Sequence, residues 1–203
     1  MAPRKYNLGK RAASVQDRRS KIVDAIVSLH AEKGVLATSV EDIARRADVA
    51  LGTVQRHFPS LDDMIRACGP RIVEIAKPPS PEIVSERHSL PERVKILVEE
   101  LFAFYERAAP WLEVGRCERK KLPLLDANLH HLEQRLDALV REAFRAVSFD
   151  REGRKLVTAL TDFYVWKSLS DQGMRKEAPH LITQVLLFCL EARGLTILSA
   201  QPT

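Results

Sequence analysis

The chain has 203 residues, of which 45% are apolar and 29% are charged, and its formal net charge is +5. This composition is typical of a chain that buries a hydrophobic core, and no apolar run approaches the roughly 18 residues that a membrane-spanning helix needs. The basic N-terminus, MAPRKYNLGKRAAS, lacks the apolar segment of a secretory signal. Cys68, Cys117 and Cys189 show no metal-binding spacing, so the sequence favours a reducing cytoplasm.

The positive charge is concentrated at the start of the chain. Residues 1–58 hold 11 Lys and Arg against 6 Asp and Glu, whereas the remaining 145 residues hold 21 of each kind. A basic leading segment beside a neutral body is typical of a protein with a polyanionic partner such as nucleic acid. The alternative is a solvated tail without a partner. We expect residues 1–16 to form a basic, flexible arm.

Helical spacing recurs along most of the chain and predicts an all-α protein of about nine helices. The first helix is expected over about 17–33, where Ile22, Ile26 and Leu29 lie on one apolar face and Gly34 supplies the stop.

Two short helices follow within the stretch TSVEDIARRADVALGTVQRHF, residues 38–58. Ser39 is expected to cap the first of them, with Asp42 completing a capping box. Asp48 lies at the break, where a left-handed backbone is expected, and the second short helix covers about 51–57. Two helices joined by such a tight turn describe a helix-turn-helix, whose second helix enters the major groove of DNA.

The rest of the chain predicts longer helices. A helix capped by Ser60 is expected to be kinked or stopped at Gly69-Pro70, and the Pro- and Ser-rich residues 77–92 indicate a linker. The expected later helices cover about 91–108, 123–147, 150–172 and 177–193, with a short separate segment at 111–118.

The stretches SKIVDAIVSLHAEKG and TSVEDIARRADVALGTVQRHFPSLDDM resemble the N-terminal DNA-binding domain of the TetR family of transcriptional regulators. The resemblance covers about 50 residues, and the remainder agrees with the family only in architecture. It implies a DNA-binding domain at 17–60, an effector-binding and dimerisation domain at 61–203, a homodimer, and a small-molecule effector that releases a repressor from a palindromic operator.

The chain departs from the family pattern at several positions of this domain. Ala50 replaces the usual Ser or Thr cap, Leu51 and Leu61 stand where Lys is common, and Gln55 stands where an aromatic residue is common. His30 stands where Phe is common. These changes remove part of the usual phosphate-contacting set, so we expect DNA affinity to depend more strongly on the basic arm.

The resemblance and the exposed polar positions of the second short helix define the candidate DNA-binding residues. Gln can pair with adenine and Arg with guanine through two hydrogen bonds. Basic arms follow the backbone or enter the minor groove. The candidates are Thr38, Ser39, Arg46, Thr53, Gln55, Arg56, His57, Arg4, Lys5, Lys10 and Arg11.

The last helices carry more apolar residues than a single packed face requires, which favours a dimer interface over a monomer with a buried central helix. The interface candidates are Leu160, Val165, Leu169, Leu181, Val185 and Phe188. Aromatic residues either line an effector pocket or form ordinary core. The pocket candidates are Phe102, Tyr105, Trp111, His130, Phe163, Tyr164 and Trp166.

The sequence therefore predicts a cytoplasmic transcriptional regulator with no cofactor, metal or catalytic residue. His130 and His131 are adjacent on a helix and point about 100° apart, which disfavours a shared metal ion. No GxSxG, HExxH or phosphate-binding glycine loop is present, so an enzyme is not expected. The alternative is a dimeric small-molecule-binding or adaptor protein that has lost specific DNA binding.

Overall fold

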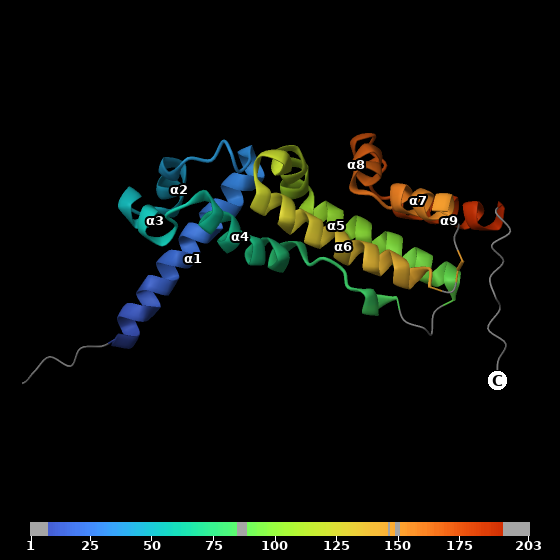
Figure 1. Ribbon diagram of the computed structural model, residues 1–203, viewed down its shortest axis with the longest axis horizontal. Helices are drawn as coiled ribbons and strands as arrows, with labels where there is room; N and C mark the ends of the chain where they lie inside the picture. Colours follow the sequence, from blue (N-terminus) through green and yellow to red (C-terminus); the bar gives the residue numbers. More distant parts are fainter. Residues whose placement is uncertain (1–7, 85–88, 146, 149–150, 193–203) are drawn as a thin grey trace, which may run out of the picture. The chain divides into compact units, whose positions relative to one another are not determined.

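The computed structural model describes residues 8–84, 89–145, 147–148 and 151–192, and within these residues every regular element is helical. The predicted all-α class is confirmed (Figure 1). The α-helices are α1 (Leu8–Lys33), α2 (Val40–Ala47), α3 (Leu51–His57), α4 (Leu61–Ala76), α5 (Leu90–Glu118), α6 (Pro123–Ala143), α7 (Arg151–Leu160), α8 (Phe163–Asp171) and α9 (Ala178–Ala192). Two short 3-10 helices cover Pro81–Ile83 and Arg119–Lys121.

The first helix begins earlier than the sequence pattern predicts. The expected flexible arm covered residues 1–16, but α1 starts at Leu8, so residues 8–16 are helical and that part of the expectation is wrong. The segment contains no proline, and Ala12 and Ala13 are strong helix formers, which favours extension of the helix beyond its buried part. At the other end, Gly34 adopts a φ of 94° and ends α1 as predicted.

Two later helix boundaries also differ from prediction. The expected gap at 109–110 is absent, because α5 runs continuously through Pro110. A proline inside a helix removes one backbone hydrogen bond, and the flanking turns here keep the helix continuous. Conversely, the single helix expected over 150–172 is divided into α7 and α8, since Asp162 caps α8 by accepting a hydrogen bond from the backbone N–H of Tyr164 at 2.8 Å.

The chain forms two compact units. The first contains residues 1–75 and 109–129, and the second contains residues 76–108 and 130–203. In the first unit α2 packs on α1, and α3 packs on α2. Its core includes Ile26, Ile43 and Val54, all fully buried. The functional boundary expected near residue 60 stays a prediction, because a packing unit need not coincide with a functional domain.

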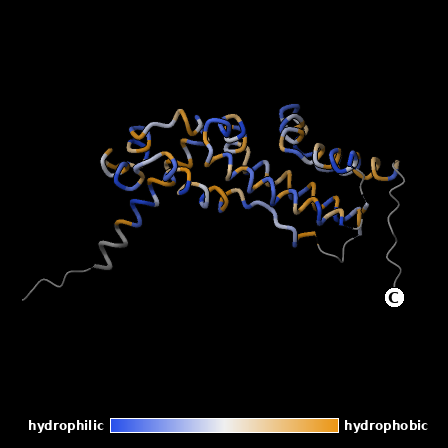
Figure 2. The backbone as a smooth tube through the Cα atoms, in the orientation of Figure 1, coloured by the Kyte–Doolittle hydropathy of each residue, from blue (hydrophilic) through white to orange (hydrophobic). Residues whose placement is uncertain are grey.

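The second unit has an aromatic core. Phe104 and Phe163 are fully buried, and the hydroxyl of Tyr105 donates a hydrogen bond to the backbone oxygen of Thr161 at 2.9 Å. An ion pair of 3.0 Å between Arg175 and Glu106 lies in the same unit. Along the helices of both units polar and apolar residues alternate (Figure 2), as expected when one face of a helix is buried and the other is solvated.

Candidate nucleic-acid interface

The turn between α2 and α3 has the geometry that its sequence predicts. Ser39 caps α2, and the capping box with Asp42 is complete. Asp48 adopts the expected left-handed conformation, with φ 52° and ψ 53°, which Asp tolerates better than most residues other than glycine. The N–H of Val49 donates to the backbone oxygen of Ala44 at 3.0 Å. These interactions fix the direction in which α3 leaves the turn.

The second helix of the motif has one buried and one exposed side. Val54 is fully buried, and Phe58, which follows the helix, is nearly so. Thr53 and His57 are half-buried at the edges of this contact. As predicted, Ala50 provides no side-chain cap. The residues that α3 exposes are Leu51, Gly52, Gln55 and Arg56.

The two hydroxyl groups before α2 are used inside the motif. The Thr38 hydroxyl donates to the backbone oxygen of Gly34 at 2.6 Å, and the Ser39 hydroxyl donates to the Asp42 carboxylate at 2.8 Å. Lys33 also donates to this carboxylate, and its hydrogen bond is the main reason why the pKa of Asp42 lies below its usual range. A phosphate at this end of α2 would therefore be bound by backbone N–H groups rather than by these hydroxyls.

Arg46 is held by a bidentate ion pair. Its guanidinium donates to the two carboxylate oxygens of Glu32 at 2.7 and 2.8 Å. The hydrogen bond from Arg46 holds the pKa of Glu32 below its usual range. Because both side chains are substantially exposed, the pair is open to competition from another anion.

The candidate residues of the basic arm lie outside what the structure describes or at its edge. Arg4 and Lys5 lie outside the described residues. Lys10 and Arg11 lie in the first turn of α1, and their side chains also fall outside what the structure describes.

One basic residue that was not predicted from the sequence lies beside α3. The guanidinium of Arg19 lies over the ring of Phe58, 5.3 Å from its centroid. Arg19 and His57 both line a shallow concavity of about 280 Å³. No sequence signal indicates the contact of Arg19 with Phe58, because the two residues are 39 positions apart and each fits the pattern of its own segment.

A carboxylate from α5 holds the loop between α1 and α2. Glu118 accepts hydrogen bonds from the backbone N–H groups of Val35, at 2.8 Å, and of Leu36, at 3.3 Å. The positive φ of Gly34 favours glycine, and a methyl group placed on its Cα atom would lie 2.6 Å from the Glu118 Oε1 atom, so a larger residue would displace this carboxylate. This loop leads directly into the capping box of α2.

A histidine and a cysteine face each other in the core of the first unit. The Nδ1 atom of His30 lies 3.8 Å from the Sγ atom of Cys68, and the His30 Nε2 atom is buried without a hydrogen-bond partner among the described residues. Burial lowers the pKa of His30 to about 4 and raises the pKa of the Cys68 thiol to about 11. Both side chains are therefore neutral at ordinary pH, as expected of core residues.

Four of the predicted pocket residues pack together in the core of the second unit. Phe163 packs against Tyr105 and Trp166, with ring centroids 5.6 Å apart in each pair, and Phe102 lies 6.2 Å from Tyr105. All four are buried against other side chains, which is the core alternative rather than an open pocket.

The remaining three pocket candidates are less buried than these four. Trp111 belongs to the first unit, where its indole N–H donates to the backbone oxygen of Val27 at 2.9 Å. The His130 side chain is 66% exposed and Tyr164 is 56% exposed, and both belong to the second unit. The ring centroid of Tyr164 lies 5.6 Å from that of Phe163. That these three residues help to line an effector pocket stays a prediction.

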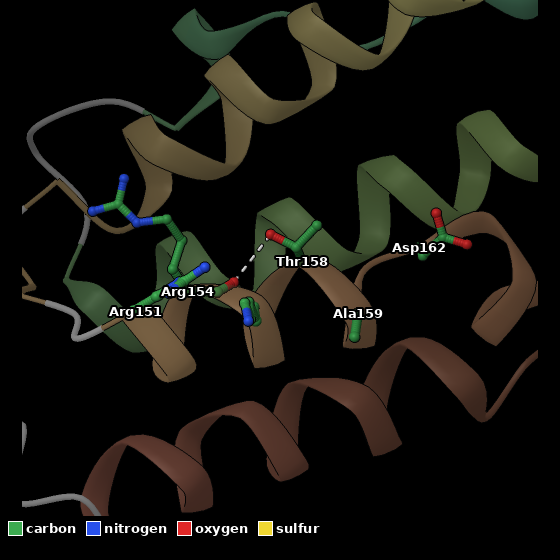
Figure 3. A pocket seen from close by; sticks show the side chains of 6 residues that line it. Arg151, Arg154, Thr158, Ala159 and Asp162 are labelled. Atoms are coloured by element: carbon green, nitrogen blue, oxygen red, sulfur yellow. Dashed lines mark hydrogen bonds between the residues drawn. The ribbon is translucent and has the colours of Figure 1, made fainter.

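An open concavity of about 740 Å³ lies along α7 in the second unit (Figure 3). Three basic side chains line it, from Arg151, Arg154 and Lys155, together with Thr158, Ala159 and Asp162. The Thr158 hydroxyl donates to the backbone oxygen of Arg154 at 3.0 Å. This concavity was not predicted from the sequence, because its basic residues resemble an ordinary solvated helix face.

The interface candidates lie on α7, α8 and α9 and differ in exposure. Phe188 is 69% exposed and Leu181 is 38% exposed, and the two residues lie about two turns apart on α9. Leu160, Val165, Leu169 and Val185 are half-buried. Large exposed apolar side chains at helical spacing are typical of a surface that another chain covers.

Comparison with known proteins agrees with this geometry. The model of the family described as bacterial regulatory proteins, tetR family, matches residues 22–68. The first part of the chain thus contains a DNA-binding domain of the TetR family. Its matched stretch contains the whole helix-turn-helix and the segment of α1 on which that motif packs.

One related repressor matches a short stretch of the chain. The HTH-type transcriptional repressor KstR of Rhodococcus jostii (strain RHA1) is 44% identical over 45 residues, which are 22% of this chain and 21% of KstR. The match thus spans about a fifth of that relative's length.

Solved structures resemble much more of the chain. A TetR-family regulator from Mesorhizobium loti has a TM-score of 0.65 at 13% identity, and the match covers 88% of this chain and 97% of that one. FadR of Bacillus subtilis, solved with stearoyl-CoA, has a TM-score of 0.55 at 19% identity, and the match covers 87% of this chain and 99% of FadR. At these identities the likeness is one of fold.

Two other kinds of site were sought in the described part of the chain. Among those residues, no group of three or more His, Cys, Asp or Glu side chains is arranged to hold a metal ion. None of the helices described is long and apolar enough to cross a membrane.

Proposed function

We propose that the protein is a sequence-specific DNA-binding transcriptional regulator that acts as a repressor. The observation that carries the proposal is the construction of α3. Val54 and Phe58 fix its inner side in the core, while Gln55 and Arg56 project from its outer side. A short helix held in this way presents its polar side chains to the edges of bases in the major groove. The repressor role rests on the name of the relative KstR.

The exposed residues of α3 supply the base contacts. Gln55 pairs with adenine and Arg56 with guanine, each through two hydrogen bonds. Thr53 and His57, at the edges of the helix, contact the phosphate backbone. Arg46 exchanges its partner Glu32 for a phosphate. The remaining contacts to phosphates come from peptide N–H groups at the start of α2, at Thr38 and Ser39, and from the basic segment with Arg4, Lys5, Lys10 and Arg11.

A homodimer would supply a second copy of α3 to the operator. The exposed apolar residues of α9, with Phe188 foremost, are the support for a twofold interface, since a twofold axis brings the same face of two chains together. Leu160, Val165, Leu169, Leu181 and Val185 extend this surface. Two α3 helices related by such an axis would contact half-sites about 34 Å apart, which requires a palindromic operator.

A small-molecule effector bound by the second unit would release the operator. The effector shifts the protein only by its difference in affinity between the DNA-binding and the free conformations. The basic concavity along α7 supports an anionic effector, because Arg151, Arg154 and Lys155 line it together (Figure 3). The buried aromatics Phe102, Tyr105, Phe163 and Trp166 would then act as core that supports this site.

The adaptor alternative, in which specific DNA binding has been lost, is not favoured. It rested on Ala50, Leu51, Gln55 and Leu61. The missing cap at Ala50 leaves α3 intact, and Gln55 remains exposed with hydrogen-bonding groups suited to a base edge.

Selection of bound duplexes from a random DNA pool tests the proposal. The purified protein should enrich one palindromic sequence, and a Gln55→Ala and Arg56→Ala double variant should enrich none. Enrichment of the same sequence by the double variant would contradict the proposal. Failure of the unchanged protein to enrich any sequence would also contradict it.

A further inference from the structure

The first turn of α3 carries an exposed apolar residue beside an exposed glycine. Leu51 is 39% exposed. A single exposed leucine carries no information by itself, because much of any protein surface is apolar. Its position is informative, since residues in the first turn of a recognition helix contact base edges.

The glycine next to it has no explanation among the described residues. A methyl group placed on the Cα atom of Gly52 would meet none of their atoms within 4 Å, and its φ is not positive. Glycine inside a helix lowers stability by roughly 0.5 to 1 kcal/mol relative to alanine. The fold therefore gains nothing from Gly52, whereas a surface that approaches the helix closely would require it.

Gly69 provides a comparison within the same unit. It also has open space around its Cα atom, but it precedes Pro70 inside α4. A proline disfavours the helical backbone at the residue before it, and glycine tolerates this restriction best. The neighbouring proline thus explains the glycine at position 69, and no such neighbour explains the glycine at position 52.

Leu51 and Gln55 lie four residues apart on α3, so their side chains are neighbours on one face. Leucine makes no hydrogen bond through its side chain, and the C5 methyl of thymine is the apolar group that the major groove presents. We infer that Leu51 contacts the C5 methyl of a thymine and is a determinant of operator sequence. This inference rests on the proposed DNA-binding function.

The spacing on the helix gives the place of this thymine. Four residues of α-helix rise about 6 Å, and successive base pairs lie about 3.4 Å apart. The thymine should lie one or two base steps from the adenine that Gln55 contacts, on either strand. An apolar contact at Leu51 thus adds base specificity where a lysine would supply only charge.

Replacement of thymine by uracil tests the inference at the level of one methyl group. Each thymine of a selected half-site is replaced by uracil in turn, and binding is measured by fluorescence anisotropy at fixed salt. For the unchanged protein, one replacement should weaken binding about fourfold per half-site, which corresponds to roughly 0.8 kcal/mol for one buried methyl. Leu51→Ala should bind the thymine and uracil duplexes equally.

Val73→Ala is the matched control, because Val73 is another exposed apolar residue of the first unit, at 47% exposure. This variant should keep the fourfold effect. Circular dichroism should show both variants fully folded, since alanine is the best helix former.

The two possible failures are distinct. If the protein selects a specific site but no uracil replacement weakens its binding, this inference alone is overturned. The same holds if the replacement weakens binding of Leu51→Ala as much as binding of the unchanged protein. Failure to enrich any sequence would overturn the proposed function, and this inference with it.

Discussion

The guanidinium of Arg46 on α2 is paired with the carboxylate of Glu32 on α1 through two hydrogen bonds of 2.7 and 2.8 Å. In the proposed complex the same guanidinium contacts a phosphate, so Glu32 competes with the operator for it. In the free protein the ion pair therefore holds Arg46 near the DNA-binding surface, and the guanidinium can still exchange Glu32 for a phosphate.

Removing the competing carboxylate should strengthen DNA binding. Glu32→Gln is expected to raise affinity several-fold, whereas Arg46→Ala should reduce the slope of log affinity against log salt by about 0.9 for the one phosphate that is no longer neutralised. Glu41→Gln, also exposed and also one charge less, controls for the change in net charge. Equal effects of Glu32→Gln and Glu41→Gln would show that Arg46 does not exchange partners.

The two glycines at 34 and 52 should respond in opposite ways to alanine. Gly34→Ala is expected to lower the free energy of unfolding by more than about 1 kcal/mol, because of its positive φ and the contact with Glu118. Gly52→Ala should raise it by roughly 0.5 to 1 kcal/mol and yet weaken operator binding. Urea unfolding and anisotropy measure the two properties. Unchanged operator binding by Gly52→Ala would refute the close approach.

Glu118 is expected to stabilise the loop that leads into α2. Glu118→Ala leaves the N–H groups of Val35 and Leu36 without their carboxylate acceptor, and should lower the free energy of unfolding by about 1 to 2 kcal/mol. Glu113→Ala, at an exposed position of the same helix, should change it little. Urea denaturation of both variants provides the comparison, and similar values for the two would contradict the role of Glu118.

His30 should make the stability of the fold depend on pH. Its folded-state pKa of about 4 lies below the value of 6.5 expected when unfolded, so the unfolded state binds more protons between these values. Stability is then fully present above 6.5 and is lost as the pH falls toward 4.

The size of this effect can be measured with a variant that does not titrate. Between about pH 7.5 and pH 5 the loss due to His30 should be about 2 kcal/mol. His30→Phe should lack this component when urea unfolding is repeated at both values. An identical pH dependence in His30→Phe would show that His30 does not titrate as described.

The exposed face of α9 should control assembly. Phe188→Glu places a charge on the most exposed large apolar residue of the described chain and is expected to yield monomers in sedimentation velocity. Operator affinity should fall at least tenfold with it, because a monomer contacts only one half-site. Gln184→Glu, also exposed on α9, adds the same charge as a control. A Phe188→Glu protein that stays dimeric would place the interface elsewhere.

Local sequence signals predicted the helix-turn-helix well. The Ser39 capping box, the left-handed Asp48 and the missing cap at Ala50 depend on residues within a few positions of one another, and each was confirmed. Trp111 could not be assigned in the same way, because its partner Val27 lies 84 positions away. The Glu118 contact with Val35, 83 positions apart, was missed for the same reason.

The central claim is that the protein binds one DNA sequence as a dimer. The most direct measurement is an anisotropy titration of the selected duplex, and of a scrambled duplex of the same composition, across a series of salt concentrations. We predict two chains per duplex, a linear fall of log affinity with log salt, and much tighter binding of the selected duplex at every salt concentration. Equal affinity for the two duplexes throughout the series would contradict the account.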